Sequence, residues 1–189
     1  MRDYNSIIND LNPFPWIFKS SYKFNFEEIE DKVLDYINTV NLYGGVSNVY
    51  DLDGTLKHEE PHKWKEFEYF VQKKLATSVR EIWGKWNLSQ SYMPNVLSSH
   101  ISQGNNLRTH YHQNTTIVCI SYLYVPKDSG RLLIQDPMDI YNCSRPLDNT
   151  DTRWTHIDVK TNDVLFFPGF IKHKNEPGPS KYAVSFDIG

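Results

Sequence analysis

The hydrophobic pattern of this 189-residue chain changes near Asn87. Before that point apolar residues recur at helical spacing, and after it short runs of β-branched and aromatic residues alternate with turns. The segment from about 60 to 86 carries one apolar stripe, and Pro61 stands where that helix would begin. A further helix is predicted after Asn25, which forms a capping-box pattern with Glu28.

Short strands are predicted in the second half of the chain, separated by turns rich in Gly, Pro, Asn and Asp. Their approximate ranges are 94–102, 106–112, 116–125, 130–135, 155–160, 163–168 and 181–187. Many short strands with few helices between them favour an antiparallel sandwich or barrel over a parallel sheet. We therefore expect one domain of mainly β (α+β) class, in which a helical N-terminal part, about 1–90, supports a strand-rich core, about 91–189.

Composition excludes several classes of protein. The net charge of −3 gives no broad attraction to nucleic acid or to an anionic membrane. No apolar run is long enough to span a bilayer, and the N-terminus lacks the pattern of a signal peptide. From their positions the two cysteines, Cys119 and Cys143, are not expected to form a disulfide framework. We expect a cytoplasmic protein with neither nucleic-acid nor membrane partners.

Three histidines are candidates for a metal site. His110 and His112 stand two residues apart, so on a strand they would point to the same face, and His173 follows 61 residues after His112. Imidazole nitrogens suit iron, zinc, copper and nickel. The alternative is that these are unrelated histidines of strands or loops.

A second motif is considered and rejected. Residues 49–56 match the first motif of haloacid-dehalogenase-like phosphatases, with Asp51 and Asp53 in the positions of the two catalytic aspartates. That chemistry needs a parallel doubly wound sheet, whereas this motif precedes a long helix and antiparallel-type strands. An Asp-Gly turn is the simpler interpretation.

From Ser99 to Asp187 the chain resembles the 2-oxoglutarate and Fe(II)-dependent oxygenases, most closely a small family from bacteriophages and aquatic bacteria with a His-x-His first motif. The segments that carry the resemblance are Gly104, His110–His112, Ser121–Pro126, Gly130, Asp136–Pro137, Phe167–His173 and Lys181–Asp187. The resemblance implies a double-stranded β-helix (jelly roll) with helices packed on one sheet. It also implies hydroxylation of a small-molecule or peptide-like substrate by O2, with conversion of 2-oxoglutarate to succinate and CO2. If the gene belongs to a phage, the protein would work in the cytoplasm of the host.

The resemblance also implies the roles of individual residues. His110 and His173 match the two histidine ligands of Fe(II). His112 stands where the wider superfamily has a carboxylate, so the metal is held by all three histidines or by His110 and His173 with water. Asp136 is the nearest downstream acid in an ordered-looking segment, but nothing places it at the metal.

Lys181 stands where the family typically carries the arginine that binds the distal carboxylate of 2-oxoglutarate; the alternative is an exposed lysine at the start of a strand. Tyr122 and Ser185 are further candidates for binding the co-substrate. Tyr122 and Tyr124 are expected to share a face, where both could equally serve packing.

Other interpretations remain open. A three-histidine cupin-type metalloprotein would oxidise a small thiol or catechol-like substrate without 2-oxoglutarate, although the expected glutamate is missing where Thr116 and Ile117 stand. A non-catalytic jelly-roll binding module is a further possibility. The polar stretch 138–153 is a candidate lid. The other histidines (His58, His62, His100 and His156) are interpreted as surface or core residues, and the sequence does not define the oligomeric state.

Overall fold

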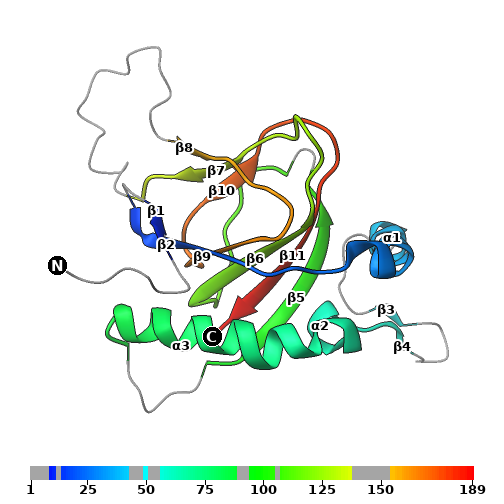
Figure 1. Cartoon of the computed structure of the whole chain (residues 1–189), viewed down its shortest axis with the longest axis horizontal. Helices are drawn as coiled ribbons and strands as arrows, with labels where there is room; N and C mark the ends of the chain where they lie inside the picture. Colours follow the sequence, from blue (N-terminus) through cyan, green and yellow to red (C-terminus); the bar gives the residue numbers. More distant parts are fainter. Residues whose placement is uncertain are drawn as a thin grey trace.

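A computed structural model describes residues 9–11, 14–42, 49–50, 56–88, 94–104, 107–137 and 154–189 (Figure 1). The strands are β1 (Asn9–Leu11), β2 (Phe14–Ser21), β3 (Val49–Tyr50), β4 (Leu56–His58), β5 (Val96–Gln103), β6 (Ile117–Tyr124), β7 (Leu132–Gln135), β8 (Trp154–Ile157), β9 (Asp163–Pro168), β10 (His173–Asn175) and β11 (Tyr182–Ile188). The helical elements are α1 (Phe26–Leu42), the 3-10 turn η1 (Pro61–Lys63), α2 (Lys65–Tyr69), the π-helical η2 (Phe70–Leu75) and α3 (Ala76–Lys85). No helix of the described residues is long and apolar enough to cross a membrane.

The strands form two main sheets, and their pairings are antiparallel. The larger sheet has six strands in the order β1-β2-β9-β6-β11-β5, and the smaller has three in the order β10-β7-β8. Non-sequential neighbours, such as β9 beside β6 and β11 beside β5, show that long connections bring distant segments together. The mainly β, antiparallel class predicted from the sequence is confirmed.

The elements lie in three layers (Figure 1). The α2–η2–α3 run crosses one face of the six-stranded sheet, and the three-stranded sheet lies on the other side. The side chains of strand β11 alternate between the two faces of the large sheet, so this strand contacts both neighbouring layers. Val184 and Phe186 join the apolar core under the helices, whereas Lys181, Ser185 and Asp187 line a cavity on the opposite face.

The N-terminal segment contributes a strand that the sequence analysis assigned to the helical part. Strand β2 pairs with β9 and extends the large sheet. Ile17 and Phe18 are both buried and belong to different core clusters, so this strand is covered on both faces. Pro13 and Pro15 obscure it in the sequence, because proline is rare in strand interiors.

Two other details differ from the sequence-based expectation. Residues 106–112 were predicted as a strand, but among the described residues of this segment His110 makes only an isolated bridge, to His173. The capping box predicted at Asn25 also differs. The side-chain amide of Asn25 donates to the Glu28 carboxylate, and the Glu28 backbone amide donates to the backbone carbonyl of Asn25.

The rejected phosphatase motif falls on the small antiparallel β3–β4 hairpin and not on a parallel strand. Its two aspartates lie outside the described residues.

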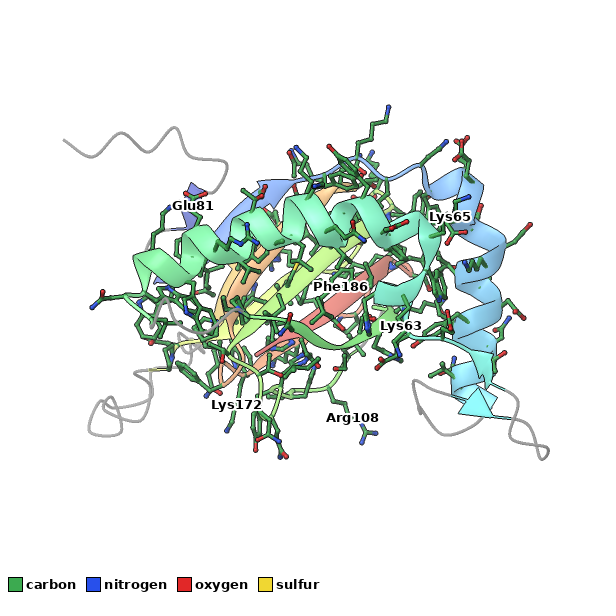
Figure 2. The ribbon with its side chains drawn as sticks, turned by 90° about the horizontal axis from the view of Figure 1, so that it is seen from below. Lys63, Lys65, Glu81, Arg108, Lys172 and Phe186 are labelled. Atoms are coloured by element: carbon green, nitrogen blue, oxygen red, sulfur yellow. The ribbon has the colours of Figure 1, made fainter. Side chains whose placement is uncertain are left out.

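Phe186 joins the helical layer to the sheet (Figure 2). Its ring is fully buried, with centroids 5.5 Å from Phe70 and 6.2 Å from Phe67. We expect Phe186→Ala to lower the free energy of unfolding by about 3–5 kcal/mol, because it removes buried apolar surface and leaves a cavity. Urea unfolding followed by circular dichroism measures this. Phe170→Ala is the control, since that ring is 62% exposed, and equal stability of the two variants would contradict the packing described.

Candidate metal centre

A backbone bridge brings the two histidine segments together. The amide of His110 donates to the carbonyl of His173 at 3.0 Å, and the amide of His173 donates back at 2.9 Å. The His112 amide donates to the Gly169 carbonyl at 2.9 Å. Only glycine fits at position 169, because a Cβ atom there would lie 2.2 Å from the carbonyl oxygen of Thr115. The glycine therefore permits the close approach of the chains that carry the histidines.

The three imidazoles converge as a result. Ring centroids lie 4.2 Å apart for His110 and His173, 5.2 Å for His112 and His173, and 5.4 Å for His110 and His112. One possible ligand atom from each residue lies within 4.8 Å of the others. No carboxylate joins this group among the described residues, and Asp136 is not part of it.

Each imidazole is oriented through its Nδ1 atom. Nδ1 of His110 lies 2.8 Å from the Arg108 carbonyl, and Nδ1 of His173 lies 3.1 Å from the Ile171 carbonyl. A carbonyl oxygen only accepts hydrogen bonds, so both Nδ1 atoms carry a proton, and Nε2 is the atom that can offer a lone pair to a metal. This arrangement is typical of histidines that bind a metal through Nε2. Arg108 and Lys172, which border the two histidine segments, lie at an edge of the molecule away from α3 (Figure 2).

His173 is the most buried of the three. Burial, with a smaller contribution from His110, lowers the pKa of its imidazole to about 3. Since the ring is then neutral at physiological pH, its lone pair is free to bind a cation.

His112 differs from the other two histidines in its Nδ1 partner. Its Nδ1 lies 2.6 Å from Oδ1 of Asp187, and the hydroxyl of Ser98 donates to Oδ2 of the same carboxylate at 2.8 Å. Burial by itself would raise the pKa of the Asp187 carboxyl, but His112 and Ser98 outweigh it and the pKa falls below its ordinary value. The sequence analysis gave Asp187 no role, although its alternation with Ser185 on β11 could have indicated one.

A cavity of about 260 Å³ adjoins the histidines between the two sheets. It is lined by all three histidines, by Lys181 and Ser185 at β11, by Tyr122 from β6 and by Asn175 from β10, among others. The structure therefore brings together every site residue that the sequence analysis nominated.

Lys181 is fully buried, in contrast to the alternative of an exposed strand-start lysine. Its Nζ donates to the carbonyl of Gly130 and lies 5.9 Å from the centre of the Tyr122 ring. Burial lowers the pKa of the ammonium to about 8, against the opposing effect of Glu176. A cation in this position can pair with an anion that enters the cavity.

Ser185 and the two tyrosines have separate surroundings. Tyr122 is buried against the cavity, and burial raises the pKa of its hydroxyl. The Ser185 hydroxyl donates to the His100 carbonyl at 3.2 Å. Tyr124 does not share the cavity face: it is 42% exposed and stacks on Phe26 at 5.5 Å. The expectation of a common face fails where the pairing between β6 and β11 shifts register.

Asn175 is a second polar residue that the sequence analysis missed. It is buried beside the cavity, and its Oδ1 has no hydrogen-bond partner among the described residues. Of the remaining histidines, His100 also lines the cavity and contacts the Tyr36 hydroxyl at 3.3 Å, whereas His62 contacts Ser99 and His156 contacts Glu176. The predicted lid, 138–153, lies outside the described residues.

Comparison with protein families matches part of the chain. Residues 96–187, about half of the chain, match the model of a family described as "Putative 2OG-Fe(II) oxygenase". This segment contains the three histidines, Lys181 and Asp187. The predicted cofactor and co-substrate, Fe(II) and 2-oxoglutarate, are those of the matching family. No curated protein sequence matches the chain.

Comparison with solved structures gives matches that cover 90–92% of this chain, of which three follow. A prolyl-4-hydroxylase from Pseudomonas putida superposes with a TM-score of 0.52 at 11% identity, over 90% of this chain and 87% of that one. Iron-bound HygX from Streptomyces hygroscopicus gives 0.51 at 13% identity, over 92% and 82%. The alpha-ketoglutarate-dependent carbocyclase SnoK from nogalamycin biosynthesis gives 0.54 at 11% identity, over 91% and 78%. The chain therefore shares the fold of these enzymes, and its strand-rich segment matches a family of 2OG-Fe(II) oxygenases.

Proposed function

We propose that this protein is an Fe(II)- and 2-oxoglutarate-dependent dioxygenase with a jelly-roll core, which forms a single domain with its helices. In this reaction a substrate C–H bond, O2 and 2-oxoglutarate give the hydroxylated substrate, succinate and CO2. The observation that carries the proposal is the convergence of three imidazoles beside a buried ammonium group that lines the same cavity.

His110, His112 and His173 would hold the iron through their Nε2 atoms. The residues fit the metal, because each Nδ1 atom already lies beside an oxygen and the most buried ring is neutral. Imidazole is a suitable ligand for iron, and three ligands on one side of an ion leave positions open for small molecules.

Lys181 would bind the distal carboxylate of 2-oxoglutarate. Its ammonium has three donors, of which the described residues engage one at the Gly130 carbonyl. A lysine lacks the planar fork of an arginine, so it supplies charge with less directional control. Tyr122, Ser185 and Asn175 border the same cavity and would add hydrogen bonds to the co-substrate.

Bound iron would supply the redox chemistry that activates O2 and cleaves the 2-oxo acid. The protein's own residues then have three tasks. The histidines fix the position of the metal, Lys181 fixes the position of the 2-oxo acid relative to it, and the apolar wall formed by Ile120, Leu132 and Ala183 excludes water from the cavity. None of these tasks needs an acid/base residue.

The substrate would approach from the outer side of His112. That histidine also borders an open concave surface, where the exposed aromatic rings of Tyr111 and Phe170 lie with the polar segment 113–116. Exposed aromatics beside amides and hydroxyls suit a small-molecule or peptide-like substrate with both apolar and polar groups.

The absence of a carboxylate from the described histidine group favours one competing function. A cupin-like metalloprotein with three histidine ligands would oxidise a thiol or catechol-like substrate by O2 alone. The buried ammonium group favours the 2-oxoglutarate enzyme instead, because such a reaction gives Lys181 no anion to bind. Consumption of 2-oxoglutarate discriminates between these two enzymes. A non-catalytic binding module would consume neither 2-oxoglutarate nor O2.

The first test is an anaerobic titration with Fe(II), with and without 2-oxoglutarate. We expect saturable Fe(II) binding and a visible charge-transfer band when 2-oxoglutarate is added, followed in air by formation of succinate. His173→Ala removes a ligand and should weaken Fe(II) binding by more than about 100-fold, beyond the ~10–100-fold typical of outer-shell changes. His156→Ala is the matched control, since that exposed histidine lies away from the centre. Fe(II) binding that is unchanged in His173→Ala would refute the assignment.

The second test is the pH dependence of 2-oxoglutarate binding. Only the protonated form of Lys181 pairs with a carboxylate, and its pKa in the free protein is about 8. The dissociation constant of the wild type should therefore rise above pH 8, approaching tenfold per pH unit. Below pH 8, where Lys181 is protonated, its titration should change the dissociation constant of 2-oxoglutarate little. Absorbance of the charge-transfer band between pH 6.5 and 9 measures the constant.

Variants assign that profile to Lys181. Lys181→Arg should bind 2-oxoglutarate with no such rise, because guanidinium stays charged, and Lys181→Met should bind weakly at every pH. Lys172→Met is the control, because that lysine is exposed. A wild-type profile retained in Lys181→Met would exclude Lys181 as the carboxylate anchor.

A further inference from the structure

The described metal group differs from the usual iron site of its enzyme class in one respect. Non-haem Fe(II) oxygenases typically use two histidines and one carboxylate, and the carboxylate lowers the net charge of the ion with its ligands by one unit. Among the described residues the group here contains His110, His112 and His173 and no acid. Three neutral imidazoles would leave the full charge of the cation in a partly enclosed cavity, where charges are poorly screened.

A carboxylate nevertheless lies directly behind one of these rings. Asp187 Oδ1 is 2.6 Å from Nδ1 of His112, and the carboxylate is held in place from its other side by the Ser98 hydroxyl. Strand pairing fixes this arrangement, since Asp187 on β11 stands opposite Ser98 on β5.

His112 is singled out by this contact. The Nδ1 atoms of the other two histidines donate hydrogen bonds to the backbone carbonyls of Arg108 and Ile171, which carry no charge. Oδ1 of Asp187 is buried and lies 2.6 Å from Nδ1 of His112, and no other described group bonds to it. A cation bound at Nε2 would fix the ring plane and hold Nδ1 against this oxygen.

We propose that Asp187 is a positioning residue that supplies, through the ring of His112, the negative charge that a carboxylate ligand would otherwise give the metal. A charged acceptor at Nδ1 makes the imidazole a stronger donor at Nε2 and fixes its orientation. The pair of His112 and Asp187 thus acts as an extended carboxylate ligand. This inference rests on the proposed function only in that the ion is Fe(II).

The test is the affinity for Fe(II) alone, measured anaerobically, followed by the position of the charge-transfer band with 2-oxoglutarate. Asp187→Asn keeps the size of the side chain and one acceptor oxygen but removes the charge. We expect it to weaken Fe(II) binding by about 10–100-fold and to shift the band. Asp31→Asn is the matched control: it makes the same loss of charge at an exposed position on α1, so it should change the affinity by less than about threefold.

A double variant separates a role at the metal from a role in folding. His112→Asp combined with Asp187→Asn moves the charge from behind the ring to the metal itself, and should recover most of the Fe(II) affinity lost in Asp187→Asn. His112→Asp alone should bind worse than the double variant, because two carboxylates then face each other. A thermal melt of each variant identifies any that fail to fold.

Either of two results would overturn the proposal. The first is that Asp187→Asn binds Fe(II) with wild-type affinity and leaves the charge-transfer band unshifted. The second is that a folded double variant does not recover the Fe(II) affinity lost in Asp187→Asn. Both differ from failure of the proposed function. If the wild type binds Fe(II) but neither binds nor consumes 2-oxoglutarate, the dioxygenase assignment is wrong, while the comparison of Fe(II) affinities still tests Asp187.

Discussion

The site depends on a pair of backbone hydrogen bonds between His110 and His173. These bonds join the segment before β6 to the short strand β10, and so bring together residues more than sixty positions apart. A further backbone bond, from His112 to Gly169, holds the second histidine against the turn that precedes β10. Because the contacts are made by the main chain, the positions of the rings follow from the strand arrangement. Only the last degrees of freedom, the ring rotations, are left to the Nδ1 partners.

Charge placement is the second constraint on this cavity. A buried ammonium, three imidazoles and a half-buried carboxylate lie around one space of about 260 Å³. An isolated charge in such a place is costly, so each needs a partner. Asp187 has His112 and Ser98, whereas Lys181 has the Gly130 carbonyl and the ring face of Tyr122. Among the described residues the ammonium has no carboxylate in hydrogen-bond contact, so an anion entering the cavity would find a partner in Lys181.

The fold alone does not define the reaction. The solved structures that superpose on this chain include a prolyl-4-hydroxylase and a carbocyclase, at 11% identity in both cases. A shared scaffold therefore carries different outcomes, and residues outside the metal group decide between them. In this chain the surface beside His112, with Tyr111 and Phe170 exposed on it, is where such differences would act.

The sequence by itself determined the class of the fold and the candidates for the site. Short runs of β-branched and aromatic residues between turns predicted most strands of the second half. The spacing of His110, His112 and His173 nominated a metal site, and the family resemblance nominated Lys181. These signals are local, because side-chain periodicity is a property of a single strand. Strand β2 was missed because prolines interrupt its pattern, and the shared face of Tyr122 and Tyr124 was wrong because register shifts are set by the neighbouring strand.

Only the tertiary structure decided which polar groups meet. Three features depend on segments that are distant in sequence but adjacent in the fold: the burial of Lys181, the contact of Asp187 with His112, and the Asn175 amide oxygen, which has no hydrogen-bond partner among the described residues. No pattern within one strand specifies which neighbour lies across from it. The metal candidates were therefore visible in the sequence, whereas the contact between Asp187 and His112 became visible only when β11 was placed beside β5 and facing the histidine bridge.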